Sequence, residues 1–365
     1  MSNYTQKLAN MRSRRLGLDA SAALSAAFDS ASLHKSLTEA YETRGKTEAI
    51  KYALGAMQAL DAKYTEVSIQ EGDRVKKQLD AGLQTLGIPA YFEYQGSVPL
   101  DIHIRRTSDI DLLVLHGGFV TVDWTGCKAS TYVTLSGTVL DEMVALRSRC
   151  ESILDQKFPS AKVDKSGAKS ICVSGGSLQR KIDVVPSHWH DSAAYQISRE
   201  KHDREIRILD KFEKKLIANR PFLHMQKIQD KESLTNGGTK KVIRLLKNLK
   251  RDSSKDIKLS SYDIASIVWN LDSQALNKPY YLELSLVGEI LAYLQYLEAN
   301  SAQAKMIDVP DMSRKVFDSP DKFEGLRLLK AEVEELAADI AKELQPIYSY
   351  NRELIQKSLA EAYVF

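Results

Sequence analysis

The sequence lacks any apolar run that approaches the eighteen residues of a membrane-spanning helix. Its N-terminal stretch, MSNYTQKLANMRSRRLGLD, also has no apolar core long enough for a signal peptide. We therefore expect a cytoplasmic protein that does not use a membrane.

Cysteine is scarce, and the charge is nearly balanced. Cys127, Cys150 and Cys172 are the three cysteines, and their wide spacing does not match a metal-ligand motif, so we expect reduced thiols. The formal net charge is +3, which is too small to indicate a nucleic-acid partner by itself. We therefore expect that nucleic acid is not required. With 365 residues, 43% of them hydrophobic, the chain is long enough for two lobes.

One stretch carries the chemistry. Residues 95–115 read QGSVPLDIHIRRTSDIDLLVL, in which Gly96-Ser97 is followed after eleven residues by Asp109-Ile110-Asp111 and an apolar run. Side chains alternate along a strand, so Asp109 and Asp111 project to one side, roughly 7 Å apart. A second β-branched run, RKIDVVPSHW, contains Asp183. If the two strands pair, three carboxylates come together.

Carboxylates that lie side by side repel one another unless a cation sits between them, and their oxygens suit Mg²⁺. Two such ions, about 3.5–4 Å apart, can hold both the attacking and the leaving oxygen at a phosphorus atom. Glycine allows close approach of a phosphate, and a following serine offers an N–H and a hydroxyl. The alternative is a solvated strand end beside an ordinary turn. The combined pattern favours the catalytic interpretation.

With these residues the sequence resembles the DNA polymerase β-type nucleotidyltransferase superfamily, and within it the bacterial cGAS/DncV-like (SMODS) enzymes. The resemblance covers roughly residues 45–275, including QGSVPLDIHIRRTSDIDLLVLH and GGSLQRKIDVVPSHWHD. It implies an α+β fold: a polymerase β-like nucleotidyltransferase lobe with a mixed sheet and helices over residues 1–220, and a helical C-terminal lobe over 221–365. A long N-terminal spine helix would join them.

The resemblance also implies roles for individual residues. Asp109, Asp111 and Asp183 would hold two Mg²⁺ ions, with Mn²⁺ as an alternative. The nucleotide-binding positions would be Gln95, Gly96, Ser97, Lys247 and Ser261. Lys247 lies in the helix predicted over residues 239–251, where the row Lys240, Arg244, Lys247 and Arg251 falls opposite the apolar side. A solvated basic face is the other interpretation of this row.

The implied activity joins NTPs, namely ATP and also GTP, UTP or CTP, into a cyclic di- or oligonucleotide second messenger with release of pyrophosphate. In bacterial anti-phage (CBASS-type) signalling, a downstream effector would detect the product. Two alternatives stay open: an RNA, protein or small-molecule acceptor, and a catalytically silent nucleotide-binding protein. The latter predicts a missing carboxylate, whereas all three are present. The sequence leaves open the bases, ring size, linkage, activating signal, oligomeric state and any regulatory protein partner.

The hydrophobic pattern predicts further elements. Residues 20–45 read as helical and are expected on the catalytic lobe, Ser68–Glu71 reads as a capping box that begins a helix ending at Gly87, and residues 139–154 read as a helix. His116-Gly117-Gly118 is expected to break the preceding strand, and from about residue 203 the pattern predicts helices only, with Phe212 on an apolar stripe.

Several chemically versatile residues are interpreted as structural. Met57 and Cys150 are expected in the core. The run from His188 to Asp191 has no metal-ligand spacing, so a structural or substrate-rim role is expected, with Trp189 or a nearby tyrosine as a candidate for stacking on a nucleobase.

Overall fold

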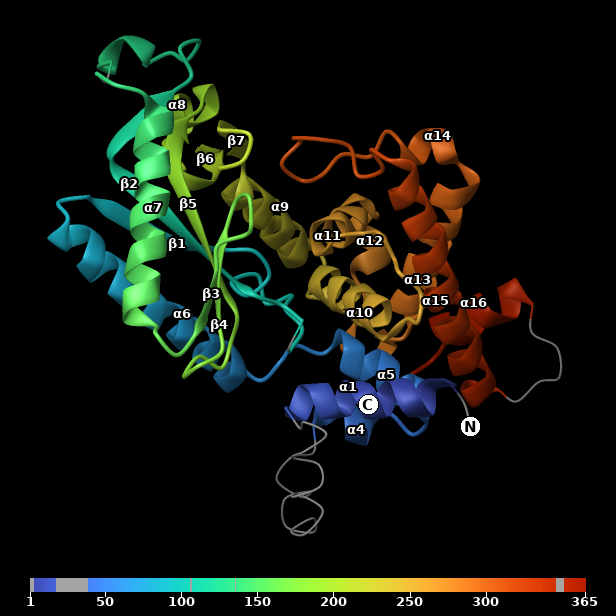
Figure 1. Cartoon of the computed structure of the whole chain (residues 1–365). Coiled ribbons are helices and arrows are strands. Elements are labelled where there is room, and N and C mark those ends of the chain that lie inside the picture. The colour runs from blue at the N-terminus through green and yellow to red at the C-terminus, as the bar shows by residue number, and fades with distance from the viewer. Residues whose placement is uncertain (1–2, 18–38, 106, 135, 346–350) are drawn as a thin grey trace. The chain divides into compact units, whose positions relative to one another are not determined.

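The computed structural model describes residues 3–17, 39–105, 107–134, 136–345 and 351–365 (Figure 1). Within them the chain forms two compact units. The sheet unit comprises Asp61–Asp101 and Ser108–Lys227, and the helical unit comprises Met1–Leu60, Ile102–Thr107 and Ile228–Phe365. A mixed sheet with helices and a separate set of helices make the fold α+β, as the sequence predicts.

The sheet unit contains seven strands and its own helices. Its elements are α6 (Ala62–Thr85), β1 (Ala90–Gln95), β2 (Ile110–Val122), a 3₁₀ turn (Ala129–Thr131), α7 (Val139–Lys157), β3 (Lys162–Asp164), β4 (Ile171–Ser174), β5 (Ile182–Asp191), α8 (Ala193–Ser198), a second 3₁₀ turn (Lys201–Asp203), β6 (Glu205–Asp210), β7 (Lys215–Asn219) and the start of α9 (Pro221–Leu234).

The strands β2 and β5 form the centre of the sheet. The strand order is β1-β2-β5-β4-β3, and β6 pairs with a later part of β5 and with β7. The pairing of β2 with β5 is parallel, whereas β1 pairs with β2 in the antiparallel sense. The long strand β5 therefore has β2 along one side and two short neighbours along the other.

Helix α6 begins earlier than the sequence pattern predicts. Asp61 caps it by accepting a hydrogen bond from the Lys63 N–H, and Ser68 lies inside the helix with its hydroxyl donating to the Tyr64 carbonyl. The predicted capping box at Ser68 is therefore wrong, because an aspartate seven residues upstream already satisfies the free amides. The predicted end is confirmed, since Gly87 adopts a positive φ of 70° just after the helix.

Helices α6 and α7 cover one face of the sheet (Figure 1). Their apolar side chains pack with alternate residues of the central strands, including Leu112 of β2 and Val184 of β5. Cys150 of α7 is fully buried in this core, and burial raises the pKa of its thiol to about 12. The expectation that Cys150 is an apolar filler is confirmed.

Two predictions about the strands are wrong. The strand β2 continues through His116-Gly117-Gly118, and the pairing absorbs the glycines as an irregularity between His116 and Thr121. The helix predicted beyond residue 203 is instead the hairpin β6–β7. Ile206 and Ile208 point to one hydrophobic core, and Leu209 points to the other. Because both faces of this strand are apolar, the three-residue spacing of Ile206 and Leu209 resembles that of a helix. Phe212 lies in the turn and is exposed.

The helical unit contains α1 (Asn3–Leu16), α4 (Ala40–Arg44), α5 (Glu48–Met57), the end of α9, α10 (Gly238–Asp252), α11 (Ser261–Asn270), α12 (Ser273–Leu276), a 3₁₀ turn (Tyr280–Leu282), α13 (Ser285–Ala299), α14 (Ser301–Ala304), α15 (Pro320–Leu344) and α16 (Arg352–Ala360).

The N-terminal helices group with this unit, whereas the sequence analysis placed residues 1–220 together. The physical reason is a set of buried contacts. Arg14 of α1 pairs with Asp252 of α10 at 2.7 Å, and the Tyr52 hydroxyl of α5 donates to the same carboxylate at 2.9 Å. Met57 is fully buried, as predicted. Most of the helix expected over residues 20–45 lies outside the described residues, which show α4 at its end.

Across the described residues, the structure contains no helix with both the length and the apolar character needed to cross a membrane.

Candidate active site

Three aspartates lie at the beginning of the two central strands. Asp109 immediately precedes β2, Asp111 lies in β2 and Asp183 lies in β5. Asp111 and Asp183 are direct partners in the parallel ladder, and Gln95 of β1 is the partner of Asp111 on the other side. The neighbours Ile110 and Leu112 belong to the core under α6 and α7, so Asp111 projects to the opposite face.

A lysine joins two of these carboxylates. The Lys181 ammonium lies 2.7 Å from an oxygen of Asp109 and 3.4 Å from an oxygen of Asp183. Lys181 stands two residues before Asp183, and residues at this spacing share one face of an extended chain. Lys181 is not among the site residues predicted from the sequence, although the spacing Lys-x-Asp is a sequence signal for its contact with Asp183.

The pKa values of this cluster reflect burial and mutual charge. Burial raises the pKa of Asp183, the Lys181 ammonium lowers it, and the Asp109 charge raises it again, so the pKa stands above its usual value. For Lys181, burial acts to lower the pKa, but the hydrogen bond to Asp109 and the charge of Asp183 outweigh it and leave the pKa raised. Lys181 is therefore firmly charged at neutral pH.

The donor set fits a divalent cation by its chemistry. Three carboxylates provide hard oxygens, and two of them already hold a positive charge between them. Among the described residues, no group of three His, Cys, Asp or Glu side chains is arranged ready to hold a metal ion.

Gly96 lies against Asp111. Its φ of +82° is in the left-handed region, and a Cβ at this position would stand 2.4 Å from the Asp111 Oδ2 atom. Glycine is thus required both by the backbone and by the carboxylate. Ser97 follows in a turn and is half-buried. The Gln95 side-chain oxygen is buried without a hydrogen-bond partner. These three residues form an incompletely satisfied polar edge next to Asp111.

Cys172 is a neighbour of Asp183 that the sequence does not predict. It is the β4 partner of Asp183 and is partly buried. Burial raises the pKa of its thiol, and the nearby Lys181 ammonium acts in the opposite direction. Only strand pairing could have revealed this proximity.

Lys247 is buried in the helical unit. Its exposed fraction is 4%, and its ammonium donates to the Ile102 carbonyl at 2.6 Å. One turn earlier in α10, buried Arg244 donates to the Met57 carbonyl at 2.7 Å. The interpretation that both side chains lie opposite the buried side of α10 is therefore wrong. Only Lys240 and Arg251 of the predicted row are more exposed. The row misled because long cationic side chains can satisfy buried carbonyls.

Ser261 is the first residue of α11 and is exposed. The preceding Ser260 caps the helix, and Asp263 completes the capping box. The Ser261 hydroxyl is therefore not needed for the cap. It lies in the helical unit together with Lys247, whereas Gly96, Ser97 and the aspartates belong to the sheet unit.

Residues 188–191 have structural partners. Asp191 accepts hydrogen bonds from Arg204 at 2.6 Å and from the Tyr132 hydroxyl at 2.8 Å. Trp189 is 7% exposed, and its ring packs against Phe222 with Arg204 above it. The structural interpretation of this run fits these contacts. A nucleobase could stack on Trp189 only if one of these contacts opened.

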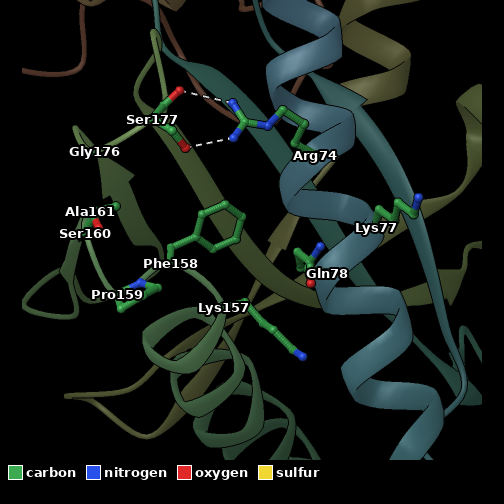
Figure 2. Close-up of a pocket in the computed structure, with 10 residues that line it drawn as sticks. All are labelled: Arg74, Lys77, Gln78, Lys157, Phe158, Pro159, Ser160, Ala161, Gly176 and Ser177. Carbon is green, nitrogen blue, oxygen red and sulfur yellow. Dashed lines mark hydrogen bonds between the residues drawn. The ribbon is translucent and has the colours of Figure 1, made fainter.

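Two cavities of the sheet unit do not contain the aspartates. One, of about 700 Å³, is lined by Arg74 and Lys77 of α6, Lys157 of α7 and Ser177, to which Arg74 donates (Figure 2). It lies on the side of the sheet covered by α6 and α7. The other, of about 500 Å³, is lined by Tyr91, Trp189 and Arg204 among others. Neither cavity is lined by Asp109, Asp111 or Asp183.

Comparisons with known proteins agree with this geometry. Residues 226–344 match the family model of the cGAS/DncV-like nucleotidyltransferase C-terminal helical domain. A cyclic dinucleotide synthase CdnE of Yersinia aleksiciae is 42% identical over 312 residues, which cover 84% of this chain and 81% of that protein.

Solved structures show the same fold. A STING-associated CdnE c-di-GMP synthase of Capnocytophaga granulosa superimposes with a TM-score of 0.72 at 26% identity, covering 94% of this chain and 100% of that one. A Rhodothermus marinus CdnE c-UMP-AMP synthase with Apcpp and Upnpp gives a TM-score of 0.60 at 17% identity, with 82% and 98% covered. By its three aspartates, its sheet and its similarity over most of its length, the chain belongs to the bacterial cGAS/DncV-like nucleotidyltransferases.

Proposed function

We propose that this nucleotidyltransferase joins two NTPs into a cyclic dinucleotide and releases pyrophosphate. The direct pairing of Asp111 with Asp183, with Gly96 against Asp111, is the observation that carries the proposal. The relative from Yersinia is named as a cyclic dinucleotide synthase. The two similar solved structures are of a c-di-GMP synthase and a c-UMP-AMP synthase. The identity of the two bases in the product of this chain therefore stays open.

The aspartates are proposed to hold two Mg²⁺ or Mn²⁺ ions. When bound, such ions supply charge neutralisation at the triphosphate and activate the attacking hydroxyl. The chain's own part is to place three carboxylates at the start of two neighbouring strands, with Asp109 just before β2, Asp111 in β2 and Asp183 in β5. We propose that Asp183, the direct β5 partner of Asp111, also helps to deprotonate the attacking hydroxyl.

The polar edge beside Asp111 is proposed to bind the β- and γ-phosphates. A glycine leaves the backbone open to an anion, and the Ser97 hydroxyl can donate to a phosphate oxygen. The amide of Gln95 can donate as well. Lys247 and Ser261 are retained as phosphate-binding candidates of the helical unit, although Lys247 must then leave the Ile102 carbonyl.

Catalysis by this site rests on position and charge, as in other phosphoryl transfers. The 3′- or 2′-hydroxyl of one nucleotide attacks the α-phosphorus of the other, and the bond to pyrophosphate breaks. The linear intermediate then turns in the same site for the second transfer. We further propose that the product serves anti-phage signalling through a downstream effector. A regulatory protein partner is an additional element of this proposal.

The test uses labelled NTPs in all pairwise mixtures, followed by phosphatase. We expect a phosphatase-resistant product from the wild type and at least a thousandfold less from Asp111→Asn and from Asp183→Asn. Asp155→Asn is the matched control, because Asp155 is an exposed residue of α7 that pairs with Lys165. Product that survives both active-site changes would overturn the proposal. Label transferred only to added RNA, protein or small molecule would replace cyclisation by another acceptor.

A further inference from the structure

Lys181 stands where a cation is needed. It immediately precedes β5, and the N–H of Ile110 donates to its carbonyl at 3.1 Å, which fixes its backbone beside the start of β2. From there its ammonium reaches Asp109, just before β2, and Asp183 of β5. The side chain is 43% exposed, so it is free to swing away from both carboxylates.

The contact of Lys181 with Asp109 and Asp183 reduces the repulsion between carboxylates in the nucleotide-free enzyme. Three carboxylates gathered at the start of two neighbouring strands repel one another. One ammonium between two of them offsets part of that repulsion. A metal ion bound by the same oxygens does the same, and the two cations cannot share the place without repelling each other.

An incoming triphosphate changes this balance. It supplies oxygens that complete the coordination of a hard divalent ion. It also supplies a new anionic partner for a lysine, because an ammonium is a compact phosphate-binding charge. When nucleotide and metal bind together, the Lys181 ammonium can exchange the aspartates for a phosphate. When metal binds alone, no such new partner is present for the ammonium.

We propose that Lys181 is an internal counter-ion that holds the metal position in the nucleotide-free enzyme and so makes metal binding dependent on the nucleotide. This inference rests on the proposed function, in which the aspartates hold the metal. Lys181 acts here as a positioning residue, since it works through Asp109 and Asp183. Lys181 thereby stabilises the three aspartates when no metal is bound. It also weakens the binding of metal when no nucleotide is present.

The test measures Mn²⁺ binding to the full chain by the loss of the free-ion electron paramagnetic resonance signal, without nucleotide. We expect Lys181→Met to bind Mn²⁺ about tenfold more tightly than the wild type. The matched control is Lys162→Met, because Lys162 is an exposed lysine of β3, 77% exposed, that lies 3.9 Å from Asp164. The double variant Lys181→Met with Asp183→Asn should lose the gain. Equal affinity in Lys181→Met and Lys162→Met would overturn the inference.

Thermal melting provides a second readout. Without metal, Lys181→Met should melt at a lower temperature than the wild type, and saturating Mn²⁺ should raise its melting temperature more than that of the wild type. Lys181→Gln is used in the same way if the methionine variant does not fold. An unchanged metal response in the variant that folds would contradict a counter-ion role.

The two proposals fail separately. If Asp111→Asn keeps forming product, the proposed catalytic function is wrong whatever Mn²⁺ does. If the aspartate variants abolish product but Lys181→Met binds Mn²⁺ like the wild type, only the counter-ion role is wrong.

Discussion

Asp111 and Asp183 face each other as direct partners across the parallel ladder of β2 and β5. Parallel pairing sets their spacing through the backbone, so neither side chain depends on a loop for its place. A slip of one residue in this register would turn one carboxylate into the core formed by Leu112 and Val184. The site is thus specified by the same apolar alternation that specifies the sheet.

Gly96→Ala should abolish most activity at a small cost in stability. A Cβ at this position meets the Asp111 carboxylate at 2.4 Å, and the positive φ adds strain of about 1–2 kcal/mol. We expect at least a hundredfold lower rate of product formation. Gly87→Ala is the control, because Gly87 has a φ of +70° with nothing within 4 Å of its Cβ position. Equal activity of the two variants would show that the Gly96 contact has no catalytic consequence.

Lys247→Met should destabilise the protein in the absence of nucleotide. The change leaves the Ile102 carbonyl without its buried donor, which costs about 1–3 kcal/mol. Chemical denaturation measures the effect, and Lys240→Met in the same helix, which removes a more exposed ammonium, should change stability by less than about 0.5 kcal/mol. Unchanged stability together with a raised KM for NTPs would instead assign Lys247 to the phosphates alone.

His188 should make stability fall on acidification. Burial lowers the pKa of its imidazole to about 4, whereas an unfolded histidine titrates near 6.5. Between these values the unfolded chain binds a proton that the folded chain does not. Stability is therefore fully present above about pH 6.5 and decreases toward pH 4, by up to about 3 kcal/mol. Burial also lowers the pKa of His116 and His190, which adds to the same slope.

His188→Leu should flatten this dependence in urea denaturation between pH 7 and pH 5. His202→Gln, at a more exposed histidine, serves as the matched control variant. A slope unaffected by His188→Leu would show that this imidazole does not carry the effect.

The thiols should differ sharply in reactivity. Cys127 is exposed and should react with a thiol reagent in the native protein, whereas the fully buried Cys150 should react only on unfolding. Burial raises the pKa of Cys150 to about 12, so its thiolate is absent at neutral pH. Mass spectrometry of the labelled peptides checks this, and Cys127→Ser should remove the fast-reacting site. Early modification of Cys150 would contradict the packing of α7.

The sequence was informative where local chemistry and local geometry coincide. The proximity of the Gly-Ser pair to Asp111 agrees with the sequence, because a strand period of two and a glycine turn are read from neighbouring residues. The place of Asp183 beside Asp111 was predictable because a β-branched run tends to pair with a neighbouring strand. The end of α6 at Gly87 was likewise a local signal.

Features that depend on tertiary contacts were not predictable in this way. The β6–β7 hairpin was assigned to a helix because spacing alone cannot show which core each residue joins. Lys247 was expected on the side of α10 opposite its apolar stripe because its acceptor, the Ile102 carbonyl, lies 145 residues away. Lys181 is absent from the predicted site because its contact with Asp109 becomes visible only when β2 and β5 are paired.

The helical unit is assembled from three separate stretches of the chain. A fragment that begins at Ile228 carries Arg244 and Lys247 but lacks Met57 and Ile102, whose carbonyls receive these two cations. Truncation or recombination at the end of the sheet unit therefore leaves the charged groups of Arg244 and Lys247 without these hydrogen-bond acceptors. An exchange of the helical unit between relatives therefore has to transfer all three stretches at once.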